Sequence, residues 1–141
     1  MNSKSTVNVQ CHCGEIQLAL LTDNSVDELP VRRCLCGFCT SHGSVYTSDS
    51  DAKLEIRLRD PDGVSRYRNP HSISEQTMFF LVRRTCGVAP AAISEIDGRE
   101  YAVVNVTAVC APPLLMENSV DMDFDEETLE GRLARRKKTW I

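Results

Sequence analysis

The sequence lacks long hydrophobic runs. No apolar stretch approaches the roughly 20 residues that a membrane-spanning helix requires, and residues 1–6 contain no apolar segment of the kind that directs secretion. We therefore expect a cytoplasmic protein that does not bind membranes. The 141 residues have a globular composition, and no repeat, low-complexity tract or linker divides them, so we predict a single domain over residues 1–141.

The sequence also lacks several familiar functional motifs and an excess of positive charge. It has no Gly-rich phosphate loop, dinucleotide fingerprint or Ser/His/Asp arrangement. Its net charge is −4, and nucleic-acid binding depends largely on neutralising phosphates, so we expect no nucleic-acid partner. The one basic cluster, Arg132 with residues 135–138, follows the acidic stretch 121–130. We interpret the two stretches as a solvated helix whose charges complement its macrodipole.

Short segments of two kinds predict β-strands. Some alternate apolar and polar residues with period two, and others are apolar throughout or rich in β-branched and aromatic side chains. These segments are residues 15–20, 53–59, 78–82, 91–96 and 101–106.

Turn and helix signals complete the fold prediction. Asp97-Gly98 lies between two predicted strands and indicates a hairpin with a slightly long loop. Residues 125–136 give the best helix signal, with Asp125 as the N-cap. The pattern predicts a mainly β fold with one or two short helices.

Seven cysteines are the most informative feature. Their odd number and the absence of an export signal argue against a disulfide framework, whereas clustered cysteines in a cytosolic chain are typical of metal sites. They form three groups and one isolated residue: Cys11-His12-Cys13-Gly14, Cys34-Leu35-Cys36-Gly37-Phe38-Cys39, Cys86-Gly87 and Cys110.

The group Cys34, Cys36 and Cys39 predicts a zinc site. A tight turn at this spacing can bring three sulfurs to about 2.3 Å from one ion, and three protein ligands with an open fourth position are typical of catalytic zinc. His42 is the local candidate for the remaining role. It could close a structural Cys3His site, act as the general base that moves a proton, or simply pack or face solvent in a loop.

Cys11 and Cys13 supply half of a second site, and Cys86 could be its third ligand. The glycines that follow Cys13 and Cys86 would let backbone amides approach the sulfurs. We expect His12 to point away from the site. Cys110 is either a fourth ligand or, as its apolar surroundings favour, a small buried hydrophobic residue.

In this order, the motifs Cys11-His12-Cys13-Gly14, Cys34-x-Cys36-x-x-Cys39 and Cys86-Gly87 resemble the glutathione-dependent formaldehyde-activating enzyme (centromere protein V-like) family. The resemblance covers about residues 9–106. It implies a β-tent of packed antiparallel sheets with zinc-binding loops. It also implies a structural zinc on Cys11, Cys13 and Cys86, and a second zinc on Cys34, Cys36 and Cys39 near which glutathione binds.

The implied activity is that of a carbon–sulfur lyase, which condenses glutathione with formaldehyde to S-hydroxymethylglutathione. The chain departs from the family at Arg83, where the motif Cys-x-x-Cys-Gly has its first cysteine, so the structural site has three matched ligands. Two alternatives remain open: a non-catalytic, zinc-stabilised binding module, and a nucleic-acid-associated relative, against which the acidic charge argues. Three thiolates on Zn²⁺ give a net charge of −1, which makes the ion a weaker Lewis acid.

Overall fold

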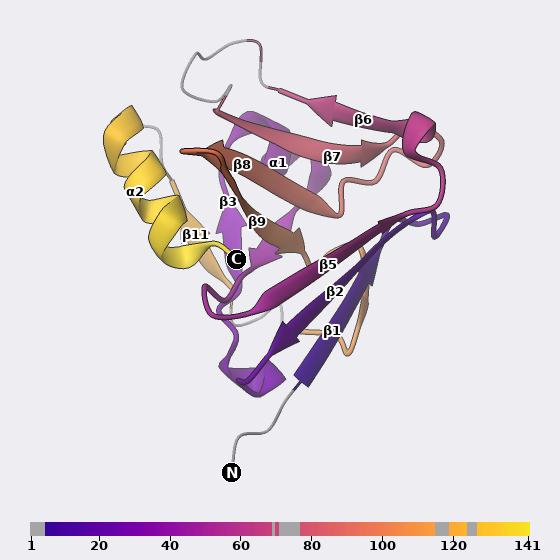
Figure 1. Ribbon diagram of the computed structural model, residues 1–141, viewed down its shortest axis with the longest axis horizontal. Helices are drawn as coiled ribbons and strands as arrows, with labels where there is room; N and C mark the ends of the chain where they lie inside the picture. Colours follow the sequence, from indigo (N-terminus) through magenta and orange to yellow (C-terminus); the bar gives the residue numbers. More distant parts are fainter. Residues whose placement is uncertain (1–4, 69, 71–76, 115–118, 124–126) are drawn as a thin grey trace.

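The computed structural model describes residues 5–68, 70, 77–114, 119–123 and 127–141. Within these ranges the strands form two sheets, with the orders β10-β1-β2-β5 and β11-β3-β4-β9-β8-β7-β6 (Figure 1). Every strand pair within these ranges is antiparallel except β11 with β3. The predicted mainly β fold, with packed sheets and a short C-terminal helix, is confirmed.

The smaller sheet buries one face. In β1 the side chains of Val7 and Val9 are buried, and in β2 those of Ile16, Leu18 and Leu20 are buried, as strict alternation requires. The predicted strands at 15–20 and 53–59 are both confirmed. The strands of this sheet are β10 (Val109–Ala111), β1 (Ser5–Gln10), β2 (Ile16–Thr22) and β5 (Lys53–Leu58).

The larger sheet contains the predicted hairpin. Its strands are β11 (Val120–Met122), β3 (Arg32–Cys34), β4 (Val45–Thr47), β9 (Arg99–Asn105), β8 (Ala91–Ile96), β7 (Met78–Arg83) and β6 (Val64–Tyr67). Ile96 pairs with Arg99, so the loop has two residues and the predicted longer loop is wrong. Asp97 (φ 53°) and Gly98 (φ 79°) are both left-handed, as a tight hairpin turn requires.

The larger sheet is buried on both faces, which explains the continuous apolar run in β7. Phe79 and Leu81 pack into the core shared with the smaller sheet. Met78 and Phe80 belong to a second cluster on the opposite face. A strand covered on both sides carries apolar residues at successive positions.

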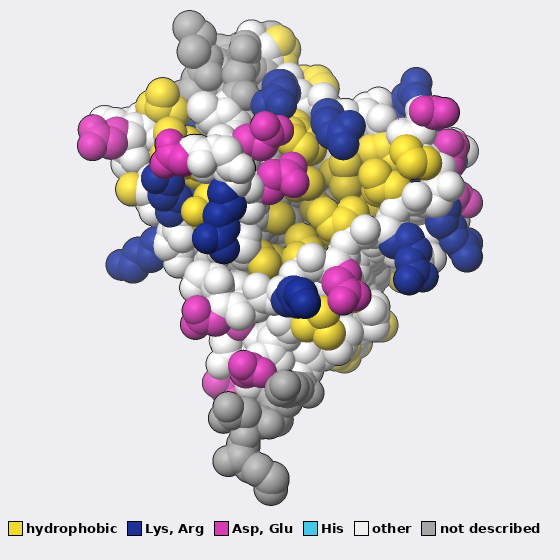
Figure 2. All heavy atoms as spheres, in the orientation of Figure 1, with side chains coloured by type: hydrophobic (Ala, Val, Ile, Leu, Met, Phe, Trp, Pro, Cys, Tyr) yellow, Lys and Arg dark blue, Asp and Glu magenta, His cyan; other side chains and the backbone are white. Residues whose placement is uncertain are grey.

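The two sheets are set at an angle to each other (Figure 1), and the first core lies between them. In the same view, Figure 2 shows hydrophobic side chains at the surface between β5 and β7. Leu54, Leu58 and Val64 are partly buried against this core. This arrangement agrees with the tent of packed sheets that we expected.

The C-terminal helix α2 spans Leu129–Thr139 and packs against β8 (Figure 1). Thr128 is its N-cap: the Thr128 hydroxyl accepts a hydrogen bond from the Gly131 N–H at 3.0 Å. The predicted cap, Asp125, lies outside the described residues, and the helix begins later than predicted. No helix within the described ranges is long and apolar enough to cross a membrane.

The charge pattern of α2 is as predicted, but its solvation is not. Glu130 lies in the first turn and three basic residues lie in the last, which complements the macrodipole. However, the exposed fractions of Arg132 and Arg136 are only 5% and 2%. The prediction of a solvated basic cluster is therefore wrong for these two arginines, which point into the protein.

Candidate metal centres and the adjoining cavity

Two turns bring together the sulfurs of Cys11, Cys13 and Cys86, which we call the first triad. All three sulfurs lie within 4.8 Å of one another, and those of Cys11 and Cys13 are 3.6 Å apart. Two sulfurs at about 2.3 Å from a tetrahedral zinc would lie roughly 3.8 Å apart. The first triad could therefore hold a metal ion.

Both turns depend on glycine. Gly14 and Gly87 have φ angles of 82° and 76°, which side-chain-bearing residues rarely adopt. The Gly14 N–H donates to the Cys11 carbonyl at 3.0 Å, and the Gly87 N–H donates to the Arg83 carbonyl at 2.7 Å. The Ile16 N–H points at the Cys11 sulfur at 3.3 Å. These contacts confirm that the glycines shape turns around the sulfurs.

Arg83 lies beside the first triad, three residues before Cys86. It is buried, and hydrogen bonding to the Cys13 sulfur and to the Asp60 carboxylate raises its pKa. Its Nη1 lies 3.2 Å from an Asp60 oxygen. The described residues therefore supply three thiols here, with the Arg83–Asp60 ion pair beside them.

Cys34, Cys36 and Cys39 form the second triad, and their sulfurs also lie within 4.8 Å of one another. Cys34 ends β3, and Cys36 is the N-cap of α1 (Gly37–His42). The Cys39 N–H donates to the Cys36 sulfur at 3.4 Å, so the sulfur acts as the capping acceptor. The predicted tight turn is thus the first turn of a short helix.

The thiols of the second triad share their protons unequally. Hydrogen bonding with Cys34, and then with Cys39, lowers the pKa of Cys36 to about 2. The same sharing raises the pKa of Cys39. A thiolate is the form that binds metal ions, so this donor set suits a thiophilic ion.

A cavity of about 90 Å³ adjoins the second triad. The three cysteines and apolar side chains, including Met78, Phe80 and Trp140, form part of its lining. The Tyr46 hydroxyl, which also faces this cavity, lies 3.3 Å from the Cys39 sulfur. The charged lining residues are Arg32, Arg132, Arg135 and Arg136.

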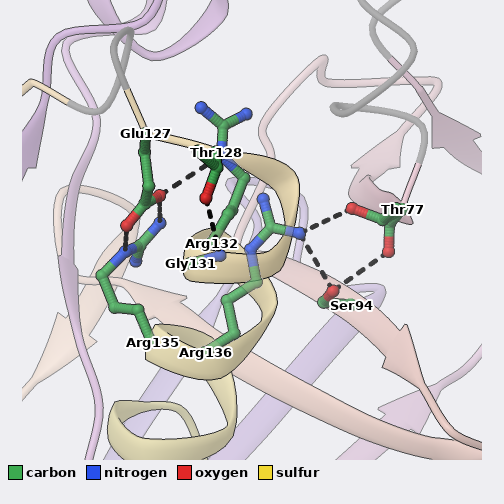
Figure 3. A network of polar contacts seen from close by, with 8 residues as sticks. All are labelled: Thr77, Ser94, Glu127, Thr128, Gly131, Arg132, Arg135 and Arg136. Carbon is green, nitrogen blue, oxygen red and sulfur yellow. Dashed lines mark hydrogen bonds and ion pairs between the residues drawn. The ribbon is translucent and has the colours of Figure 1, made fainter.

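The helix arginines differ in their partners, as Figure 3 shows. Arg135 contacts both oxygens of Glu127, at 2.9 and 3.1 Å, and Arg132 contacts one of them at 3.3 Å. Arg136 instead donates to the hydroxyls of Thr77 at 2.8 Å and Ser94 at 3.1 Å. Burial, followed by the charge of Arg135, lowers the pKa of Arg136 to about 10.

The other predicted residues lie apart from the sulfurs. His42 is exposed and stacks on Phe38, with 4.2 Å between ring centroids, and its Nδ1 lies 2.9 Å from the Phe38 carbonyl oxygen. His42 and His12 line a separate hollow of about 270 Å³. Cys110 is half-buried, and neither it nor the histidines belong to a triad of described residues. The catalytic role of His42 stays a prediction.

The sequence analysis missed Tyr46 and the buried arginines of α2. No local motif marks Tyr46, which faces Cys39 from the next strand. For the arginines a signal existed: Arg132 and Arg136 are four residues apart and so share one face of a helix.

Comparison with known proteins supports the fold. No family model and no curated protein matches the chain. A crystal structure of a Rhodobacter sphaeroides protein is similar, with 24% sequence identity and a TM-score of 0.51. The match covers 72% of this chain and 86% of that one. The likeness concerns the fold alone, and the chain shares that fold with the bacterial protein.

Proposed function

We propose that this chain is a zinc-dependent carbon–sulfur lyase that condenses glutathione, or a related thiol, with formaldehyde or another small aldehyde. The observation that carries the proposal is the second triad, whose three sulfurs line a cavity suited to a small ligand. The three motifs that resemble the formaldehyde-activating family supply the reaction class.

Both triads have the donors that zinc prefers. Cys34, Cys36 and Cys39 would hold the catalytic ion, with three protein ligands and a position left for the substrate. When bound there, zinc would lower the pKa of a thiol and so supply the thiolate nucleophile. Cys11, Cys13 and Cys86 would hold an ion with a structural role, because they link turns from β1–β2 and β7–β8.

The reaction joins the thiol sulfur to the aldehyde carbon, and the thiol proton ends on the former carbonyl oxygen. The apolar wall of Met78, Phe80 and Trp140 would limit the access of water to the reactants. The Tyr46 hydroxyl could donate a hydrogen bond to the oxygen as its negative charge develops. We propose His42 as the group that exchanges the proton with solvent, consistent with its exposure.

The alternative is a non-catalytic, zinc-stabilised binding module. Among the described residues, no Asp, Glu or His lines the cavity, so no strong base lies beside the second triad there. A zinc ion with three thiolates is also a weak Lewis acid. This alternative predicts bound zinc with neither glutathione affinity nor turnover.

The test measures zinc per chain and glutathione binding by calorimetry, in the wild type and in Cys36→Ser. We expect two zinc ions in the wild type, and one zinc ion with no glutathione binding in the variant. Cys110→Ser is the matched control, since its sulfur is outside both triads and contacts the Pro112 carbonyl instead. It should retain both ions.

Turnover must be measured separately, because glutathione and formaldehyde also combine spontaneously. Exchange spectroscopy by NMR gives the interconversion rate at equilibrium with and without protein. An exchange rate that rises with wild-type protein but not with Cys36→Ser supports the lyase. Zinc binding without glutathione affinity or rate enhancement leaves only the binding module.

A further inference from the structure

We propose that the arginine side of this cavity is a carboxylate-binding site, in which Arg136, assisted by Arg132 and Arg32, binds a carboxylate of an acidic thiol. The inference deepens the proposed function, since the thiol at the second triad and the carboxylate at the arginines would belong to one ligand. The anion site itself does not depend on catalysis.

Arg136 is the central observation. It is 2% exposed and lines the cavity, yet its hydrogen-bond partners among the described residues are two neutral hydroxyls. Its guanidinium lies 5.1 Å from the centre of the Trp140 ring. Its Nε is buried and has no hydrogen-bond partner among the described residues. A buried charge is costly unless it is paired. A carboxylate would supply both the missing charge and an acceptor.

The positive charge around the cavity also favours an anionic ligand. Four guanidiniums line it, and the carboxylate that contacts two of them is Glu127. A zinc ion with three thiolates would contribute one further negative charge. Among the described residues, Arg32 and Arg136 contact hydroxyls and not carboxylates, so their charge is available to an anionic ligand.

The size and lining of the cavity suit a carboxylate. A cavity of about 90 Å³ has room for a carboxylate and a short thiol arm. Arg32 also points a donor at the Ser48 hydroxyl, at 3.0 Å, rather than at an acid. The partly apolar lining lowers the local dielectric and strengthens a charge-assisted hydrogen bond.

The thiols of the second triad and the arginines line the same cavity. Cys34, Cys36 and Cys39 line it together with Arg136. A small molecule that carries a sulfur and a carboxylate could therefore contact both sides at once. A neutral thiol without a carboxylate, such as 2-mercaptoethanol, would make only the sulfur contact.

The test uses a probe that cannot react: the glutathione analogue in which a methyl group replaces the thiol, together with its diethyl ester. Both are titrated by calorimetry into zinc-loaded protein. We expect the free acid to bind the wild type, and the ester to bind at least about tenfold more weakly, which is the scale of one hydrogen bond to a charged group. The affinity of the acid should fall as salt rises.

Arg136→Gln should weaken binding of the acid by at least about tenfold, and Arg136→Lys should recover part of the loss. Lys138→Gln is the matched control, because it removes one positive charge from the exposed side of the same helix and should change affinity less than twofold. Thermal unfolding checks that each variant is folded. If Arg136→Gln does not fold, Arg32→Gln takes its place.

The outcomes separate this inference from the lyase proposal. Equal affinity for acid and ester, no binding of the acid, or binding indifferent to Arg136 and Arg32 overturns the carboxylate site, whatever the turnover with glutathione. Displacement of the acid by millimolar inorganic phosphate would show a general anion site and overturn selectivity for carboxylates. Arginine-dependent binding without any rate enhancement upholds the carboxylate site and removes the lyase.

Discussion

The guanidinium of Arg83 lies 3.2 Å from the carboxylate of Asp60, at the position where a Cys-x-x-Cys motif would have its first cysteine. The ion pair closes one side of the first triad, and hydrogen bonding to Cys13 joins it to the sulfurs. Arginine cannot be a metal ligand because it remains protonated. At this position the first triad therefore has a cation with its own counter-ion beside it, and not a fourth anionic ligand.

Arg83→Cys should convert the first triad into a four-cysteine site. The Gly87 N–H already donates to the carbonyl of residue 83, which is the turn that such a motif requires. We expect the ion to be held at least about tenfold more tightly, measured by competition with a chromophoric chelator. Arg84→Cys, on the exposed neighbouring residue, is the control. Equal metal affinity in the two variants would refute this account.

Gly63→Ala should displace Arg83. A Cβ atom at residue 63 would lie 1.8 Å from the Arg83 Nη1 and 2.7 Å from an Asp60 oxygen, so the buried guanidinium must move. We expect the free energy of unfolding in urea to fall by about 1–2 kcal/mol. Gly37→Ala is the matched control, since a Cβ there meets nothing within 4 Å. A loss no larger than that of the control would contradict the prediction.

Asp49 should make stability depend on acid pH. Burial acts to raise its pKa, but hydrogen bonds from the Thr22 hydroxyl, the Asp51 N–H and the Asn24 amide outweigh burial and lower it. A lowered pKa stabilises the fold above the unfolded-state value of about 3.9, and this contribution is lost as pH falls through the folded-state pKa.

The test is Asp49→Asn, with Asp51→Asn as the exposed neighbour control. We expect Asp49→Asn to lower the free energy of unfolding by about 1 kcal/mol at pH 7. The difference from wild type should shrink below about pH 4, where the carboxylate is protonated in both states. A difference that stays constant across this range would exclude the carboxylate as its source.

Thr128→Ala should lower the free energy of unfolding, because it removes the N-cap of α2. The hydroxyl accepts the Gly131 N–H, and removing an N-cap acceptor costs about 1 kcal/mol. Thr128→Ser keeps the acceptor and should be close to wild type. Urea unfolding measures both, and a larger loss in the serine variant than in the alanine variant would rule out the capping role.

Strongly patterned strands could be predicted from the sequence, and very short ones could not. The segment 53–59 alternates over a full strand, and β5 lies there. By contrast, β4 has three residues, all buried, which give no period to read. The helix α1 was missed because Cys36 caps it through sulfur, and cysteine is not among the residues that normally signal a helix start.

The candidate site was predictable in its ligands but not in its surroundings. The cysteine motifs, together with the family resemblance, indicated which sulfurs would meet, although Cys86 is far from Cys11 in sequence. The burial of Arg136 could not be inferred, because a basic cluster in a polar helix normally faces solvent. Only tertiary packing of α2 against β8 turns that residue inward.

Strand β7 serves two compartments, because Phe79 belongs to the core between the sheets and Phe80 to the cluster beside the second triad. Alternate residues of this one short strand therefore contribute to the inter-sheet core and to the binding cavity. A substitution at Phe80 can reshape the cavity while the inter-sheet contacts of Phe79 persist. Over evolutionary time, such a chain can change what it binds without changing how it folds.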